Sequence, residues 1–145
     1  MKIPHYVSVA EVQKVCRELK IRDWTKIRDA RVTGREAGAI LKIVNTENMT
    51  IPREIFRRGL EVELEHGVRF SDANVTNNHP LLTGMIVLAH LKEMMDYYER
   101  LEVAELEGDL FKAVKAGDLK KVKKYYGKLA AAKRELHEME SRAGR

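Results

Sequence analysis

The sequence contains little cysteine, proline or aromatic residue, and it has no long hydrophobic run. Cys16 is its only cysteine, so the chain can form no internal disulfide, and we expect it in a reducing, cytoplasmic compartment. Three prolines and 6% aromatic residues, beside abundant Ala, Leu, Glu, Lys and Arg, favour an all-α fold. No segment reaches the roughly 20 apolar residues of a membrane span, so we expect no membrane partner.

The length and composition fit one globular domain. The chain has 145 residues, of which 44% are hydrophobic and 34% charged, so it is long enough to bury a core and is not disordered in composition. We therefore predict a single all-α domain over 1–145. Its parts are an N-terminal helix and irregular segment over 1–50, an antiparallel helical hairpin core over 51–108, and a basic C-terminal helical extension over 109–145.

Capping residues mark the first helix, whereas the segment after it is ambiguous. Ser8 and Glu11 have the spacing of a capping box, which predicts a helix over about 8–20. Trp24 is expected to dock on the core. Residues 39–44 are a brief apolar run that fits a short helix or a strand equally well.

Prolines and a glycine mark the ends of the two hairpin helices. Pro52 predicts the start of the first helix and Gly67 its end. Pro80 lies in the first turn of the second helix, which is predicted to run to about Glu107.

Acidic and imidazole side chains fall on the dry faces of these helices when each is wound at about 100° per residue. Glu63 lies in the middle of the apolar face of the first helix, with His66 beside it. His90 lies among the apolar residues of the second helix, and Glu93 lies at the border of that face. A carboxylate in such an interface must be paired, hydrogen-bonded or bound to a metal ion.

The four side chains suggest a metal site. A structural polar network and acid/base catalysis are the two alternatives. Glu63 and His66 form a Glu-x-x-His pair, and His90 and Glu93 form the reverse pair, which together suit Zn²⁺, Mn²⁺ or Fe²⁺. The same groups can instead form a structural polar network, completed by the hydroxyls of Thr83 and Tyr97. Acid/base catalysis is a third reading. Cys16 lies on an apolar stripe and is expected to be a core residue rather than a nucleophile.

Charge is unevenly distributed along the C-terminal half. Residues 92–109 carry two basic and seven acidic side chains, whereas residues 110–134 carry nine basic and one acidic. The Gly-Asp pairs at 108–109 and 117–118 each predict a helix stop followed by a new N-cap, so the last helix spans about 118–141. The acidic and basic segments can pair within the molecule, or the basic one can bind a polyanion. Its densest part contains Lys120, Lys121, Lys123 and Lys124.

Three strings resemble a family of small uncharacterised proteins from bacteria, archaea and phages, known only as a domain of unknown function. They are GLEVELEHG at 59–67, NVTN at 74–77 and AHLKEMMDYY at 89–98. The resemblance covers about 54–101 and implies a shared helical core without giving an activity. The family usually has acidic residues after NVTN, where this chain has Asn78 and His79, which makes His79 a possible extra ligand. Residues 21–51 and 109–145 look like additions to that core.

Two hypotheses of different classes follow. In the first, the chain is a small metal-binding helical protein with Glu63, His66, His90 and Glu93 as ligands. In the second, it is a non-catalytic interaction or assembly protein, of cellular or viral origin, whose basic C-terminal helix contacts a protein or nucleic acid. Helix faces also allow a homo-oligomer. The sequence does not decide whether the protein is an enzyme.

Overall fold

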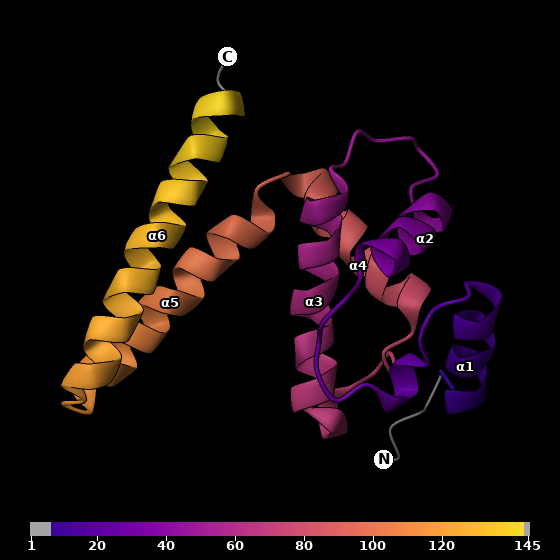
Figure 1. Cartoon of the computed structure of the whole chain (residues 1–145), viewed down its shortest axis with the longest axis horizontal. Helices are drawn as coiled ribbons and strands as arrows, with labels where there is room; N and C mark the ends of the chain where they lie inside the picture. Colours follow the sequence, from indigo (N-terminus) through magenta and orange to yellow (C-terminus); the bar gives the residue numbers. More distant parts are fainter. Residues whose placement is uncertain (1–6, 144–145) are drawn as a thin grey trace. The chain divides into compact units, whose positions relative to one another are not determined.

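A computed structural model, which describes residues 7–143, shows a chain that is helical and contains no β-strand over that range. The predicted all-α fold class is confirmed. Residues 1–6 and 144–145 of the predicted parts lie outside the described residues. The elements, in order, are α1 (Val9–Glu18), η1 (Trp24–Lys26), α2 (Gly34–Val44), α3 (Arg53–Arg69), η2 (Ser71–Ala73), α4 (Pro80–Glu93), α5 (Tyr97–Lys115) and α6 (Leu119–Ala143), where η denotes a 3-10 helix (Figure 1).

The chain divides into two units, one ending at Glu93 and the other beginning at Met94. The first unit holds α1 to α4, and the second holds α5 and α6. The single domain expected over 1–145 stays a prediction.

The core of the first unit lies among α2, α3 and α4, each of which packs on the other two. Ile40, Phe56, Leu60 and Val87 are completely buried there, and so is Trp24 of η1, whose indole donates a hydrogen bond to Glu36 of α2. α1 packs on η1 and on α4. The indole of Trp24 therefore docks on the core, as the sequence suggested.

The ambiguous segment 39–44 belongs to α2 and is helical. Its N-terminus is a capping box: the Thr33 hydroxyl accepts a hydrogen bond from the amide of Glu36 (3.2 Å), and the Glu36 carboxylate accepts one from the amide of Thr33 (2.9 Å). Two orphan amides at the helix start are thus satisfied. The cap precedes the apolar run, so the run viewed alone does not reveal it.

Glu36 also ties α2 to the segment before it. Its carboxylate oxygens accept hydrogen bonds from Arg22 Nε and Nη2, both at 2.9 Å, and from Trp24 Nε1 at 3.2 Å. Burial alone raises the pKa of this carboxyl, but the hydrogen bonds from Arg22, Thr33 and Trp24 outweigh burial and lower the pKa to about 2. Glu36 is therefore a buried anion with a complete set of donors.

Gly84 lies where α4 packs closely against α2. A Cβ at this position would lie 2.5 Å from Ile40 Cγ2 and 3.4 Å from Val44 Cγ1. Only a residue without a side chain allows the two helices to approach to this distance.

Two predicted helix ends of the hairpin differ from the structure. α3 continues through Gly67 to Arg69. The helix that begins at Pro80 ends at Glu93, and a turn leads into α5, which begins at Tyr97. The prediction of one helix to about Glu107 is therefore wrong. The intervening residues include neither proline nor glycine, so the usual sequence signals of a helix end are missing there.

The second unit is an antiparallel hairpin of α5 and α6 (Figure 1). Its narrow core contains Leu106, Leu129 and Ala132. Gly117, with φ +66°, ends α5, and the Asp118 carboxylate accepts a hydrogen bond from the amide of Lys121 (3.0 Å), as the Gly-Asp pattern predicted.

The other Gly-Asp pair, at 108–109, lies inside α5, so the stop predicted there is wrong. Core residues on both sides, Leu106 and Leu110, pack on α6 and keep the helix continuous. Their packing overrides the helix penalty of glycine, which is about 1 kcal/mol.

Candidate functional site

Glu63 on α3 and His90 on α4 meet at the interface of these two helices. Glu63 Oε1 lies 3.7 Å from His90 Nε2, and the two side chains are 16% and 30% exposed. The antiparallel packing of α3 on α4 brings the late part of one helix to the middle of the other, which is the axial match expected from the sequence. The pair is half-buried and polar in an otherwise apolar interface.

His66 and Glu93, the other two predicted ligands, are exposed. His66 lies six residues after Leu60, about 120° around α3 from the centre of its buried face. The expectation that His66 turns inward is therefore wrong. Within residues 7–143, no three His, Cys, Asp or Glu side chains lie close enough together to hold one metal ion.

His66 and Glu63 nevertheless open onto the same surface hollow of ≈ 290 Å³. Phe70 and Val75, which are 47% and 81% exposed, form part of its apolar rim. The hollow combines a carboxylate and an imidazole with apolar walls.

The other predicted network residues are Thr83 and Tyr97. Thr83 is buried, with 3% of its surface exposed, on the core side of α4. Tyr97 is the first residue of α5 in the second unit, where its ring lies edge-on to Tyr98 with centroids 5.2 Å apart.

His79 acts as the N-cap of α4. Its carbonyl accepts a hydrogen bond from the amide of Thr83 (2.9 Å), and its Nδ1 accepts one from the amide of Leu82 (3.3 Å). Burial lowers the pKa of this imidazole, which favours the neutral form that can accept. The nitrogen nearest the backbone is thus engaged in capping.

The polar loop between α3 and α4 is held by hydrogen bonds of its own side chains. Asn74 Nδ2 donates to Gly67 O (3.2 Å) and to Asn78 Oδ1 (2.9 Å), and Thr76 Oγ1 donates to Asn74 Oδ1 (3.3 Å). Asn77 and Asn78 both have positive φ, at 49° and 58°. A Cβ on Gly67 would lie 2.2 Å from Asn78 Oδ1, so this glycine is needed for the loop to dock on α3.

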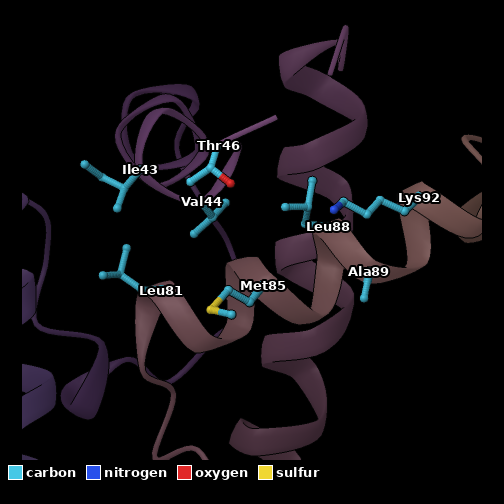
Figure 2. A pocket seen from close by; sticks show the side chains of 8 residues that line it. All are labelled: Ile43, Val44, Thr46, Leu81, Met85, Leu88, Ala89 and Lys92. Carbon is cyan, nitrogen blue, oxygen red and sulfur yellow. The ribbon is translucent and has the colours of Figure 1, made fainter. Parts of the chain in front are cut away.

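An apolar groove runs between α2 and α4 on the surface of the first unit (Figure 2). Its volume is ≈ 370 Å³. Ile43 and Met85 are 51% and 58% exposed on its walls. Lys92 lies at one end, where Nζ is 2.5 Å from Glu47 Oε1. The groove presents apolar surface with a single cation that already has an anionic partner.

Charge is segregated along the hairpin of α5 and α6. Two ion pairs fix its register: Glu107 with Lys133 at 2.7 Å, and Arg100 with Glu140 at 2.8 Å. The acidic part of α5 therefore faces the later part of α6. Residues 110–128, which form the connecting end, carry seven lysines and only Asp118 as an acid.

In this antiparallel arrangement the acidic part of α5 does not lie opposite the lysines at the start of α6, so the two segments do not neutralise each other. The lysines that begin α6 lie opposite the end of α5, which adds Lys112 and Lys115. We call this region the basic end. The lysines in it are exposed; they are Lys112, Lys115, Lys120, Lys121, Lys123, Lys124 and Lys128.

Four large apolar side chains are exposed at the basic end. Phe111, Val114, Leu119 and Tyr126 are 68%, 59%, 74% and 68% exposed. We call them the apolar strip.

The register places the strip on one flank of the hairpin. On α5, Phe111 and Val114 follow Glu107 at i+4 and i+7, and on α6, Leu119 and Tyr126 precede Lys133 at intervals of seven. Residues at these spacings share one side of a helix. The Glu107–Lys133 ion pair therefore joins the two sides that carry the strip.

Residues 12–107 match the family described as Protein of unknown function (DUF5661). The chain belongs to this family. The match begins in α1 and ends in α5, so it takes in residues 21–51, and the expectation that these are an addition to the family core is wrong. The lysines of the basic end follow the matched region. No curated protein and no solved structure gives a significant match.

Two polar clusters of the first unit escaped prediction. The first is the set of donors around Glu36. The second centres on Glu61, whose Oε1 accepts from Arg57 Nη1 (2.5 Å) and from the amide of Val32 (3.0 Å). Helical winding places Glu61 on the polar side of α3, but it does not show that the preceding segment packs against that side. The spacing of Arg57 and Glu61, four residues apart, was the available signal.

Proposed function

We propose that this chain is a non-catalytic interaction protein that binds an acidic macromolecular partner through the basic end of the α5–α6 hairpin. The observation that carries the proposal is the charge segregation along the hairpin. Seven lysines and one acid occupy residues 110–128, and the side chains of these lysines are exposed. A surface of this sign attracts anions over a distance of about 8 Å at physiological salt.

The register of the hairpin distinguishes this proposal from simple internal neutralisation. Lys133 pairs with Glu107, but the lysines at 120–124 lie beyond the acidic part of α5. Lys121 Nζ lies 3.5 Å from Asp118 Oδ2 in an exposed i,i+3 ion pair, which contributes about 0.5 kcal/mol or less. Most of the positive charge is therefore available to a partner.

The test uses heparin as a polyanion probe. In the full chain, Lys120, Lys121, Lys123 and Lys124 are changed together to Gln, and affinity is measured by fluorescence anisotropy at several salt concentrations. We expect wild-type affinity to fall steeply with salt and the variant to bind at least about tenfold more weakly.

A variant with the same net charge serves as the control. It changes four exposed lysines of the first unit to Gln: Lys14, Lys20, Lys26 and Lys42. We expect it to bind heparin nearly as well as the wild type. Equal weakening by the two variants would show that only total charge matters, and the proposal would be wrong.

A metal site at Glu63 and His90 is the second candidate. The specific observation is their 3.7 Å approach, with His66 opening onto the same hollow as Glu63. Bonds of about 2.0–2.2 Å to Zn²⁺ hold two ligand atoms of a tetrahedral site about 3.3–3.5 Å apart, close to the observed separation. Glu63 and His90 would supply two protein ligands, and the exposed His66 and Glu93 would complete the set only after turning toward them.

Elemental analysis of protein purified without an affinity tag tests this candidate. We expect bound zinc, manganese or iron that is lost in both Glu63→Ala and His90→Ala. A content below about 0.1 metal ion per chain, unchanged in the variants, contradicts it. The Glu63–His90 pair would then be a structural contact between α3 and α4.

A further inference from the structure

The apolar strip lies within the basic end. It requires something of a binding partner that the positive charge alone does not require. Four neighbouring side chains that are 59–74% exposed form a patch rather than scattered surface residues. Any partner that covers them must bring apolar surface of its own. This step rests on the proposed function and narrows the class of partner.

The hairpin is also an incomplete bundle. Its core is narrow: one hydrophobic cluster contains the buried residues Leu106, Leu129 and Ala132, with Val103, Leu110 and Tyr125 packed against them, and Tyr98 and Ala113 of α5 are also buried. A third helix packed along the flank that carries the strip would bury Phe111 and Tyr126 and complete a three-helix arrangement. Leu119 and Tyr126 are seven residues apart, so the strip extends for about two helical turns, or 10 Å.

From these observations we infer that the basic end binds an acidic amphipathic α-helix of a protein partner. The apolar face of that helix lies on the strip, and its flanking Asp and Glu residues face the surrounding lysines. Its apolar residues would recur at i, i+3 or i+4, and i+7, which matches the length of the strip.

A nucleic acid fits the surface less well. Phosphates would pair with the lysines, and Phe111 and Tyr126 could stack on bases. Val114 and Leu119 have no aromatic face to offer a base, and Leu119 is the most exposed of the four. The aliphatic half of the strip would remain without a partner.

A lipid surface also fits less well. Residues that enter a bilayer first would be those of the connecting turn, which are Ala116, Gly117 and the acid Asp118. Leu119 directly follows this turn, but Phe111, Val114 and Tyr126 lie farther along the flank of α5 and α6. Placing the strip among acyl chains would bring the charged side chains of Asp118 and Lys115 into the bilayer as well.

Three synthetic peptides of about 18 residues, or five helical turns, serve as probes. All share a helix-forming background. The first carries a leucine stripe flanked by Glu, the second the same stripe flanked by Lys, and the third the Glu residues with the leucines changed to Ser. We expect the full chain to bind the first at least about tenfold more tightly than the others.

The decisive variant is Phe111→Ser with Leu119→Ser, which leaves all lysines in place. We expect this variant to bind the leucine–glutamate peptide at least about tenfold more weakly than the wild type does, while its affinity for heparin changes by less than about twofold. The matched control is Ile43→Ser with Met85→Ser, because these groove residues are also large, apolar and half-exposed or more. Circular dichroism checks that both variants keep their helix content.

The outcomes separate the inference from the function on which it rests. If the strip variant binds the peptide like the wild type while the four-lysine variant does not, the partner is recognised by charge alone and the inference is wrong. Tighter binding to a single-stranded oligonucleotide, or to phosphatidylserine vesicles, than to any peptide would also overturn it. If neither lysine variant bound heparin more weakly than the wild type, the proposed function itself would be wrong.

Discussion

Glu36 shows how one residue connects segments that the sequence leaves unassigned. It caps α2 through Thr33, holds the Arg22 guanidinium and accepts from the Trp24 indole. A buried carboxylate with this many donors strongly favours the charged form, which is why its pKa is about 2 despite burial.

This pKa predicts a dependence of stability on pH. The folded pKa of Glu36 lies below its ordinary value of 4.5, so its contribution is complete above pH 4.5 and is lost as the pH falls toward 2. The difference corresponds to roughly 3 kcal/mol at neutral pH. We expect Glu36→Gln to lower the free energy of unfolding at pH 7 by about this amount, and by progressively less at lower pH.

Urea unfolding of wild type and variant at several pH values measures this difference. The same substitution at Glu65, an exposed position four residues along α3 from Glu61, is expected to have little effect at any pH. A constant gap between the Glu36 variant and the wild type from pH 7 to pH 2 would contradict the prediction.

At the scale of the elements, the glycines inside helices have opposite roles. A Cβ on Gly84 would lie 2.5 Å from Ile40 Cγ2 at the crossing of α4 and α2. No described atom outside the local backbone lies within 4 Å of a Cβ built on Gly108 or Gly127. The first glycine is required by packing, whereas the other two only weaken the helices that contain them.

Alanine substitutions should therefore change stability in opposite directions. We expect Gly84→Ala to destabilise the protein by about 1–3 kcal/mol through overpacking. Gly108→Ala and Gly127→Ala should each stabilise it by about 0.5–1 kcal/mol, because alanine favours the helix without a clash. Thermal unfolding followed by circular dichroism gives the signs, and a stabilising Gly84→Ala would contradict the assigned crossing.

Many of the helices could be predicted from the residues that start and stop helices and from the spacing of apolar residues. Pro80 and the Gly-Asp pair at 117–118 mark real boundaries, because each signal acts through its own backbone. The helix end predicted at Gly108 is wrong, because the packing of Leu106 and Leu110 on α6 outweighs the low helix propensity of glycine. The end of α4 at Glu93 has no local signal at all.

The candidate site was predictable only in part, for a similar reason. Winding each helix placed Glu63 and His90 in one interface, and the structure brings them to 3.7 Å. It also suggested that His66 turns inward, although its actual exposure depends on where α2 and α4 pack around α3, which is information about three helices at once.

At the scale of the whole molecule, none of the helices in the described range is long and apolar enough to cross a membrane. The family match spans α1 to α5, and the basic end lies in and after its last helix. The basic end, on which the proposed function rests, is formed by the antiparallel packing of α5 and α6 in the second unit.

Electrostatics and packing should act on different steps of binding. We expect neutralising the four lysines at 120, 121, 123 and 124 to lower mainly the association rate constant of the leucine–glutamate peptide, by about tenfold at low salt. Phe111→Ser with Leu119→Ser should mainly raise the dissociation rate constant, because apolar contact forms after encounter. Stopped-flow fluorescence separates the two constants. Equal changes in both constants for both variants would contradict this division.

The ion pair between Glu107 and Lys133 divides a hairpin whose longer helix extends for about 37 Å. Positive charge gathers at one extremity and negative charge toward the other, so the second unit carries a permanent dipole moment along its axis. An anion approaching in dilute buffer exerts a torque that rotates the lysine-bearing extremity toward it before the surfaces touch. Orientation is thereby selected during diffusion, ahead of any contact.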